Sequence, residues 1–279
     1  MSDFQRAREA LGVRLQQLRG DAGLTGRALA ARLGWPHSKI SKLENGRQTA
    51  TPHDLTAWAG ATGHPALSAS LQADLSTLET HYRSWRRRLA SGHQPAQQEA
   101  GAQERSAQVV RAYEPNVVPG MLQTPDYARH VLLASAALHQ SPRDTDDAVR
   151  ERMRRQELLY APGRHFRFIL WEGALRARVC PPGVLASQLD RLSGLVGLDT
   201  VRIGVIPFSA DLPLTLRHGF WIHDQSYVTV ETINAALHLD DQADVALYLR
   251  AWGMYEQTAA TDAEARRIIV AARHSLGAT

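Results

Sequence analysis

The sequence predicts a multidomain protein in which an all-α domain precedes an α/β domain with a mixed sheet. Its 279 residues suggest about two domains. Short helical segments with clear start and stop signals fill the first part of the chain, whereas strand-like runs separated by helices fill the last part. We therefore expect a helical domain at 1–64, a connecting helix and linker at 65–98, and the α/β domain at 99–279.

The all-α domain begins with an amphipathic helix over about residues 5–20. Leu11, Leu15 and Leu18 recur at i, i+4 and i+7, which gives the helix one apolar stripe. Gly23 is its expected end. Four or five short helices in about 65 residues would make a compact helical domain.

The stretch Leu24 to Arg47 is predicted to form two short helices joined by a tight turn. Thr25 is a good N-cap, because its hydroxyl can accept a hydrogen bond from the first helical turn. Gly34 is a helix stop, since glycine tolerates positive φ. Pro36 then starts the second helix, because its fixed φ suits a first turn.

The second of these helices presents a cationic polar face. Ile40 and Leu43 are expected to point inward and anchor it. Lys39 and Lys42 are the only two lysines of the chain, and both lie on this helix. The outward face carries His37, Ser38, Lys39, Ser41 and Lys42.

The positive charge of the chain is concentrated in its first third. The net charge is +4 and the pI about 9.5. Residues 1–90 contain 13 basic and 7 acidic residues, whereas the remainder contains 19 basic and 21 acidic residues. A basic domain attracts polyanions through counterion release, so nucleic acid is the expected partner of the helical domain.

A fourth helix is predicted to begin at Thr51. Thr51 would cap it, Pro52 takes the first helical position, and Asp54 favours the positive end of the helix dipole. The residues expected to face the core are Leu55, Trp58 and Ala59.

A longer helix is expected from about Pro65 to Leu89. Its apolar stripe suits either a dimer seam or packing on its own domain. Arg86, Arg87 and Arg88 could contact phosphate, although a basic run near a helix end is commonly solvated. The polar segment Ser91–Gln98 is predicted to be a linker. The stripe consists of Leu71, Leu75, Leu78, Tyr82 and Trp85.

The second domain is predicted from alternating strand-like and helical runs. Extended segments are expected at Val109–Tyr113, His165–Trp171, Val201–Pro207, Gly219–His223 and Ser226–Glu231. Helices are expected from Thr124 onward and over Asp144–Tyr160, Pro182–Val196, Asp241–Gln257 and Thr261–His274. The helix Pro182–Val196 would join two strands as a strand–helix–strand unit, and Asp224-Gln225 has the spacing of a hairpin turn.

The N-terminal pattern resembles the Xre-type helix-turn-helix family over about residues 8–63. The resemblance rests on the glycine turn and on Ile40, Ser41, Leu43, Glu44 and Gly46. It implies that the second helix lies in the major groove of DNA. By position, His37, Ser38 and Lys42 would reach base edges, with Ser41 on the same face. The implied phosphate contacts are Thr25, Arg27, Lys39, Asn45 and Arg47. Gly26 and Pro36 depart from the polar residues usual at their positions.

The second domain resembles the antitoxin-like domain of actinobacterial regulators over about residues 100–276. The matching blocks are Val118–Ala128, Arg152–Leu159, Leu170–Leu175, Val205–Phe208 and Val230–Thr232. The resemblance implies transcriptional control of development or antibiotic production, and binding of a small acidic partner protein.

Nothing in the sequence favours catalysis, a metal or a cofactor. It has no G-x-S-x-G, no H-E-x-x-H and no phosphate-binding glycine loop. Glu172 and Glu231 follow strand-like runs, but capping or pairing with arginine is the simpler role. The histidines at 218, 223 and 238 lack a ligand spacing. Gln123 and Tyr127 would either shape a binding surface or pack a helix start.

Further expectations concern the compartment. The single cysteine, Cys180, excludes an intrachain disulfide and suits a reducing cytoplasm. No apolar run approaches the roughly 18 residues of a membrane span, and the N-terminus lacks the apolar core of a signal peptide.

The sequence thus predicts a DNA-binding transcriptional regulator. It would bind a palindromic operator as a homodimer, because one recognition helix spans too few base pairs. It would lie in the cytoplasm, at the nucleoid when bound to DNA. The alternative to a protein partner is a small-molecule ligand of the second domain, which a deep apolar pocket would favour. An enzyme tethered to DNA is the third and least favoured reading.

Overall fold

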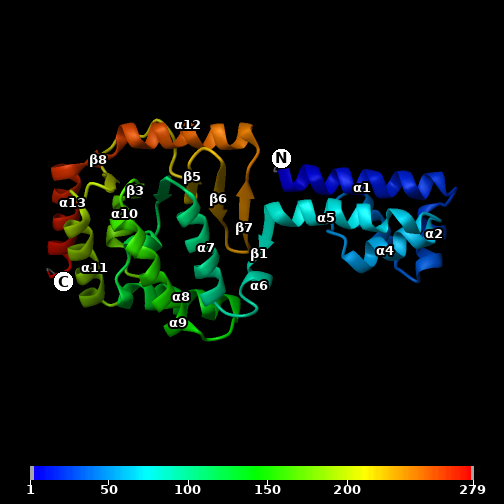
Figure 1. Ribbon diagram of the computed structural model, residues 1–279, viewed down its shortest axis with the longest axis horizontal. Helices are drawn as coiled ribbons and strands as arrows, with labels where there is room; N and C mark the ends of the chain where they lie inside the picture. Colours follow the sequence, from blue (N-terminus) through cyan, green and yellow to red (C-terminus); the bar gives the residue numbers. More distant parts are fainter. Residues whose placement is uncertain (1–2, 278–279) are drawn as a thin grey trace. The chain divides into compact units, whose positions relative to one another are not determined.

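The computed structural model describes residues 3–277, without the side chains of residues 3–7, 76–84, 86 and 87. The chain divides into two compact units, one ending at Arg83 and one starting at Ser84 (Figure 1). The first is helical and the second contains a mixed sheet, so the predicted multidomain fold class is confirmed.

The N-terminal unit consists of short helices around one apolar core. The elements are α1 (Asp3–Asp21), α2 (Gly26–Leu33), α3 (His37–Glu44), α4 (Pro52–Ala61), η1 (Pro65–Leu67) and α5 (Ser68–His81). The core contains Leu29 of α2 together with these expected anchors of the other helices: Leu11, Leu15, Leu18, Ile40, Leu43, Leu55, Trp58, Ala59, Leu71 and Leu75.

Local chemistry sets the helix boundaries here as predicted. The Thr25 hydroxyl accepts from the Ala28 amide at 3.1 Å, and Thr51 forms a capping box with Asp54. Gly34 adopts a φ of 67° and ends α2. Pro36 differs from expectation: it occupies the N-cap of α3, with ψ 138°, rather than the first helical position.

Two predictions for residues 65–98 are wrong. The expected long helix is divided into η1, α5, the strand β1 (Tyr82–Ser84) and α6 (Trp85–Arg88). The expected linker at 91–98 is also wrong, because α7 (Gln94–Ser106) starts within it and Ala96 and Gln97 are buried. Leu71 and Leu75 pack in their own unit, whereas the side chains of Leu78, Tyr82, Arg86 and Arg87 lie outside the described residues.

A mixed sheet organises the C-terminal unit. Its strands include β2 (Val109–Glu114), β3 (His165–Trp171), β4 (Val201–Ile206), β5 (Phe220–His223), β6 (Tyr227–Glu231), β7 (Ala235–Leu239) and β8 (Ala260–Thr261). The strand order is β1-β7-β6-β5-β2-β3-β4-β8. Strands β2, β3 and β4 are parallel, and antiparallel pairs flank them. The predicted strand–helix–strand unit and the hairpin between β5 and β6 are both present.

Helices cover both faces of this sheet. They are α8 (Pro125–His139), α9 (Thr145–Arg155), α10 (Glu172–Arg176), α11 (Pro182–Leu195), α12 (Gln242–Thr258) and α13 (Asp262–Ser275), with 3-10 turns η2 (Gly120–Leu122) and η3 (Gln156–Tyr160). One core packs α11 and α13, which lie side by side in Figure 1, against the parallel strands. A second core packs α12 on the opposite face, where the Tyr113 and Tyr255 rings stack at 4.2 Å. Within the described residues, no helix combines the length and apolar character that crossing a membrane requires.

Candidate nucleic-acid interface

The helix α3 is fixed to its unit by apolar anchors and by close backbone contact. Ile40 and Leu43 are 1% and 2% exposed. Gly12 of α1 lies directly against the end of α3: a Cβ built there would collide with the carbonyl oxygens of Glu44 and, at 2.7 Å, of Leu43. A glycine in the middle of a helix usually costs stability, so this one is explained by the close approach of the two backbones. No pattern in the sequence indicated this role for Gly12.

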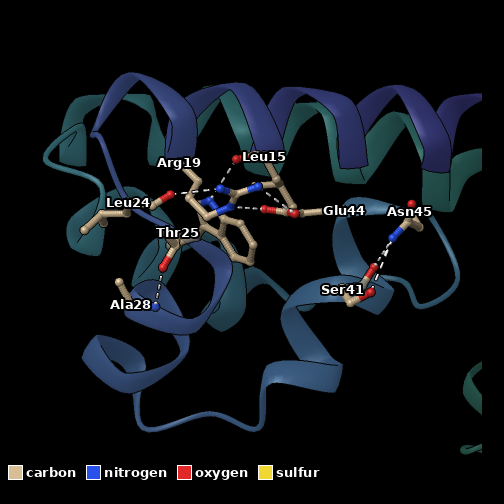
Figure 2. A network of polar contacts seen from close by, with 9 residues as sticks. Leu15, Arg19, Leu24, Thr25, Ala28, Ser41, Glu44 and Asn45 are labelled. Carbon is tan, nitrogen blue, oxygen red and sulfur yellow. Dashed lines mark hydrogen bonds and ion pairs between the residues drawn. The ribbon is translucent and has the colours of Figure 1, made fainter.

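An ion pair that the sequence analysis also missed holds the C-terminal end of α3. Arg19 of α1 donates to both carboxylate oxygens of Glu44, at 2.5 and 3.0 Å, and also to the Leu24 carbonyl at 2.8 Å (Figure 2). The hydrogen bond with Glu44 raises the pKa of Arg19. Both side chains are largely buried, so the pair fixes α3 against α1 and against the start of α2.

Lys39 joins α3 to α4. Its Nζ donates to Asp54 at 2.6 Å and lies 3.8 Å from the centre of the Trp35 ring. Burial alone would raise the pKa of Asp54, but the hydrogen bonds from Lys39 and Thr51 outweigh it, so that pKa is lowered. Lys39 is part-buried, and its predicted contact with phosphate stays a prediction.

The other predicted DNA-contacting residues lie at the surface. Ser41 is part-buried and its backbone carbonyl accepts from the Asn45 side chain at 2.8 Å, as Figure 2 shows. The His37 ring lies over Gly26, where its Nε2 would be 3.2 Å from an added Cβ. The starts of α2 and α3 therefore share one surface. The exposed members of the set are Thr25, Arg27, His37, Ser38, Lys42, Asn45 and Arg47.

The candidate residues of the second unit have structural roles. Glu172 accepts from Arg176 at 2.8 Å and from the Phe208 amide at 2.9 Å. Tyr127 is buried in the core, whereas the buried Gln123 donates to the Val118 carbonyl at 2.7 Å and lines a cavity that is described below. The described residues contain no cluster of metal-binding side chains. Cys180 is a buried free thiol whose pKa is raised by burial.

Comparison with known proteins places the second unit in a family. Residues 97–271 match the model described as a domain of unknown function, DUF5753. The chain belongs to the DUF5753 family. Residues 10–66 match a second model, described as a helix-turn-helix domain, and this range contains α2 and α3. This DUF5753 chain therefore carries a helix-turn-helix domain ahead of its family domain.

Other comparisons add little. No curated protein matches the chain. Among solved structures, the chain is similar to TrmBL2, an archaeal chromatin protein whose structure is described as showing a novel mode of DNA binding. The identity is 13%, the alignment covers 75% of this chain and 69% of that one, and the TM-score of 0.30 is too low to show a shared fold.

Proposed function

We propose that this protein is a sequence-specific DNA-binding transcriptional regulator. The observation that carries the proposal is the polar face of α3, which is exposed within a helix-turn-helix domain and anchored by Ile40, Leu43 and the Arg19–Glu44 pair. A rigidly held helix with exposed polar side chains is what reading base edges in the major groove requires. We propose that the domain is of the Xre type.

We assign the contacts of this face by position. His37, Ser38 and Lys42 would read base edges, with Ser41 beside them. Lys42 is the strongest candidate, because it is exposed and a lysine can bind the guanine acceptors O6 and N7. The contacts assigned to phosphates are Thr25, Arg27, Lys39, Asn45 and Arg47.

The regulator would act as a homodimer on a palindromic operator and would have no enzymatic activity. The DUF5753 domain would be the effector domain. Its effector would be either a small acidic protein, as the antitoxin-like resemblance implies, or a small molecule, which the partly open cavity described below favours. A protein of this kind would work in the cytoplasm, at the nucleoid, in control of development or antibiotic production.

Operator selection followed by mutation tests the DNA-binding proposal. Duplexes selected from a random pool should converge on one palindromic sequence. Lys42→Ala should then lose about 1–3 kcal/mol of binding free energy and relax the preference at one position of each half-site. Arg27→Ala should weaken binding to every sequence and reduce the salt slope by about one.

The matched control is Arg143→Ala, which removes an exposed arginine from the second unit. Its affinity should equal that of the wild type. If selection yields no preferred sequence, or if Lys42→Ala binds selected and random duplexes like the wild type, sequence reading by α3 is contradicted.

A further inference from the structure

The DUF5753 domain contains a partly open cavity of about 290 Å³, near the lower limit for small-molecule sites. Helices α7, α8 and α9 form one side, and strands β2, β5 and β6 form the other. Its wall combines apolar side chains, among them Leu132 and Trp221, with several buried charged groups. The buried positive charges exceed the buried negative charges, and this excess indicates the charge of a ligand that the cavity would bind.

Arg152 is a buried cation that forms no salt bridge within the described part of the chain, although Glu231 and Glu104 attract it from a distance. It is 9% exposed, and its guanidinium donates only to amide oxygens: Nε to Gln97 at 3.0 Å and Nη1 to Gln123 at 2.6 Å. The third nitrogen, Nη2, makes no hydrogen bond within the described part of the chain. Burial, together with the nearby Arg155, lowers the pKa of Arg152 to about 10. It nevertheless stays protonated near neutral pH.

Arg155, one turn further along α9 in the same wall, does have a salt-bridge partner. Its Nε donates to Glu104 at 2.9 Å, its Nη2 donates to the other oxygen of that carboxylate, and its Nη1 donates to Gln97 at 2.5 Å. Glu104 is therefore fully occupied by Arg155 and acts on Arg152 only from a distance. A buried charge without a salt-bridge partner destabilises the folded protein. An anion that paired with Arg152 would therefore be stabilising.

Further polar atoms in the same wall lack partners. They are Nη1 of Arg88, Nδ1 of His223 and Oγ1 of Thr229, all buried. Thr229 and Trp221 are cross-strand neighbours, and His223 lies two residues from Trp221 on β5, so these side chains project from one face of the sheet. Buried polar groups are normally hydrogen-bonded. Together these three atoms would suit the polar groups of a bound molecule.

The acidic groups of the wall do not neutralise Arg152. Burial, with a smaller contribution from Glu231, raises the pKa of Glu114 to about 8, so this carboxyl is mostly protonated near pH 7. Its Oε1 accepts from the Trp221 indole at 2.8 Å. Glu231 is exposed, and its attraction for Arg152 is screened by solvent. The enclosed part of the cavity is therefore positive.

We propose that this cavity binds a small organic anion, whose carboxylate or phosphate group pairs with Arg152 while its apolar part lies against Leu132 and Trp221. This ligand would be the effector of the proposed regulator. Binding of the anion is measured without DNA. A protein that binds no anion could therefore still bind DNA as proposed, and a protein that binds no DNA could still bind the anion.

Three probes of similar shape test the proposal on the full chain: benzoate, phenyl phosphate and uncharged benzamide. At about 10 mM, an anion that binds the native state should raise the midpoint of thermal unfolding by about 3 °C or more. Benzamide should raise it much less. The larger of the two anion effects tells whether the site prefers a carboxylate or a phosphate.

Two variants locate the effect. Arg152→Gln should respond to the anions no more than to benzamide, whereas Arg176→Gln, which alters an arginine outside the cavity wall, should respond like the wild type. The proposal is overturned if the three probes act alike on the wild type, or if Arg152→Gln keeps the full response.

A crystal of the wild type with 4-bromobenzoate provides a measurement that does not depend on any variant folding. The anomalous signal of bromine should lie inside the cavity, with the carboxylate at hydrogen-bond distance from Arg152. Bromine found only on the outer surface would contradict the assignment.

Discussion

Gly12 is the residue on which the position of α3 depends most directly. An added methyl group would collide with the backbone oxygens of Leu43 and Glu44, which cannot move without displacing α3. We expect Gly12→Ala to lower the free energy of unfolding of the N-terminal unit by about 1–3 kcal/mol. Gly60→Ala is the control, because Gly60 is helical with open space around it and should gain up to about 1 kcal/mol. Urea unfolding measures both.

The outcome also bears on DNA binding. If Gly12→Ala displaces α3 as expected, operator affinity should fall while the melting of the DUF5753 domain stays unchanged. A variant as stable as the wild type would mean that α1 and α3 can separate without cost.

Among the helices and strands, boundaries set by local contacts could be predicted from the sequence, whereas strands formed through long-range pairing could not. The helix starts at Thr25, Thr51 and Thr124 were predictable, because each cap acts within its own first turn. Strand β7 was missed, because its sequence AALHL lacks β-branched residues and becomes a strand through pairing with β6. The break in the expected long helix at β1 has the same kind of cause, since β1 is a member of the sheet.

The two candidate sites differ in the same way. The polar face of α3 follows from helical spacing, and His37, Ser38 and Lys42 are exposed as expected, whereas Lys39 and Ser41 are part-buried and Lys39 pairs with Asp54. The cavity did not follow, because the partners of Arg152 come from α7 and from the residue after η2, and only the folded chain brings them together. The sequence showed Arg152 merely as part of a family-like block.

Glu114, at the end of β2, should make the stability of the protein depend on pH. Burial raises the pKa of Glu114 to about 8, well above the roughly 4.3 of an unfolded glutamate. A raised carboxyl pKa contributes stability that is fully present below the unfolded pKa and is lost as pH rises through the folded pKa. The wild type should therefore lose stability between about pH 5 and pH 8, and Glu114→Gln should lose less. Urea titrations at several pH values, followed by tryptophan fluorescence, measure the free energy of unfolding of both proteins. Equal losses of stability in the wild type and in Glu114→Gln would contradict the prediction, because they would mean that Glu114 is ionised throughout this pH range.

For the whole molecule, most of the basic excess lies in the N-terminal unit. Residues 1–83 contain 10 basic and 7 acidic residues, whereas residues 84–279 contain 22 basic and 21 acidic residues, because Arg86, Arg87 and Arg88 belong to the second unit. The charge that would attract DNA is thus larger in the N-terminal unit, and we propose that the other unit holds an effector. If Arg152 pairs with an anion as proposed, the bound anion should stabilise the DUF5753 domain.

Coupling between the units follows from thermodynamic linkage. If the anion changes operator affinity by some factor, operator DNA must change anion affinity by the same factor. For a regulator we expect a factor of about 5–150. Titrating the anion with and without operator, and the operator with and without anion, gives two ratios that must agree. If the two ratios are equal and differ from one, the anion selects one of two states of the protein. If both ratios are one, the cavity ligand stabilises the DUF5753 domain without regulating DNA binding.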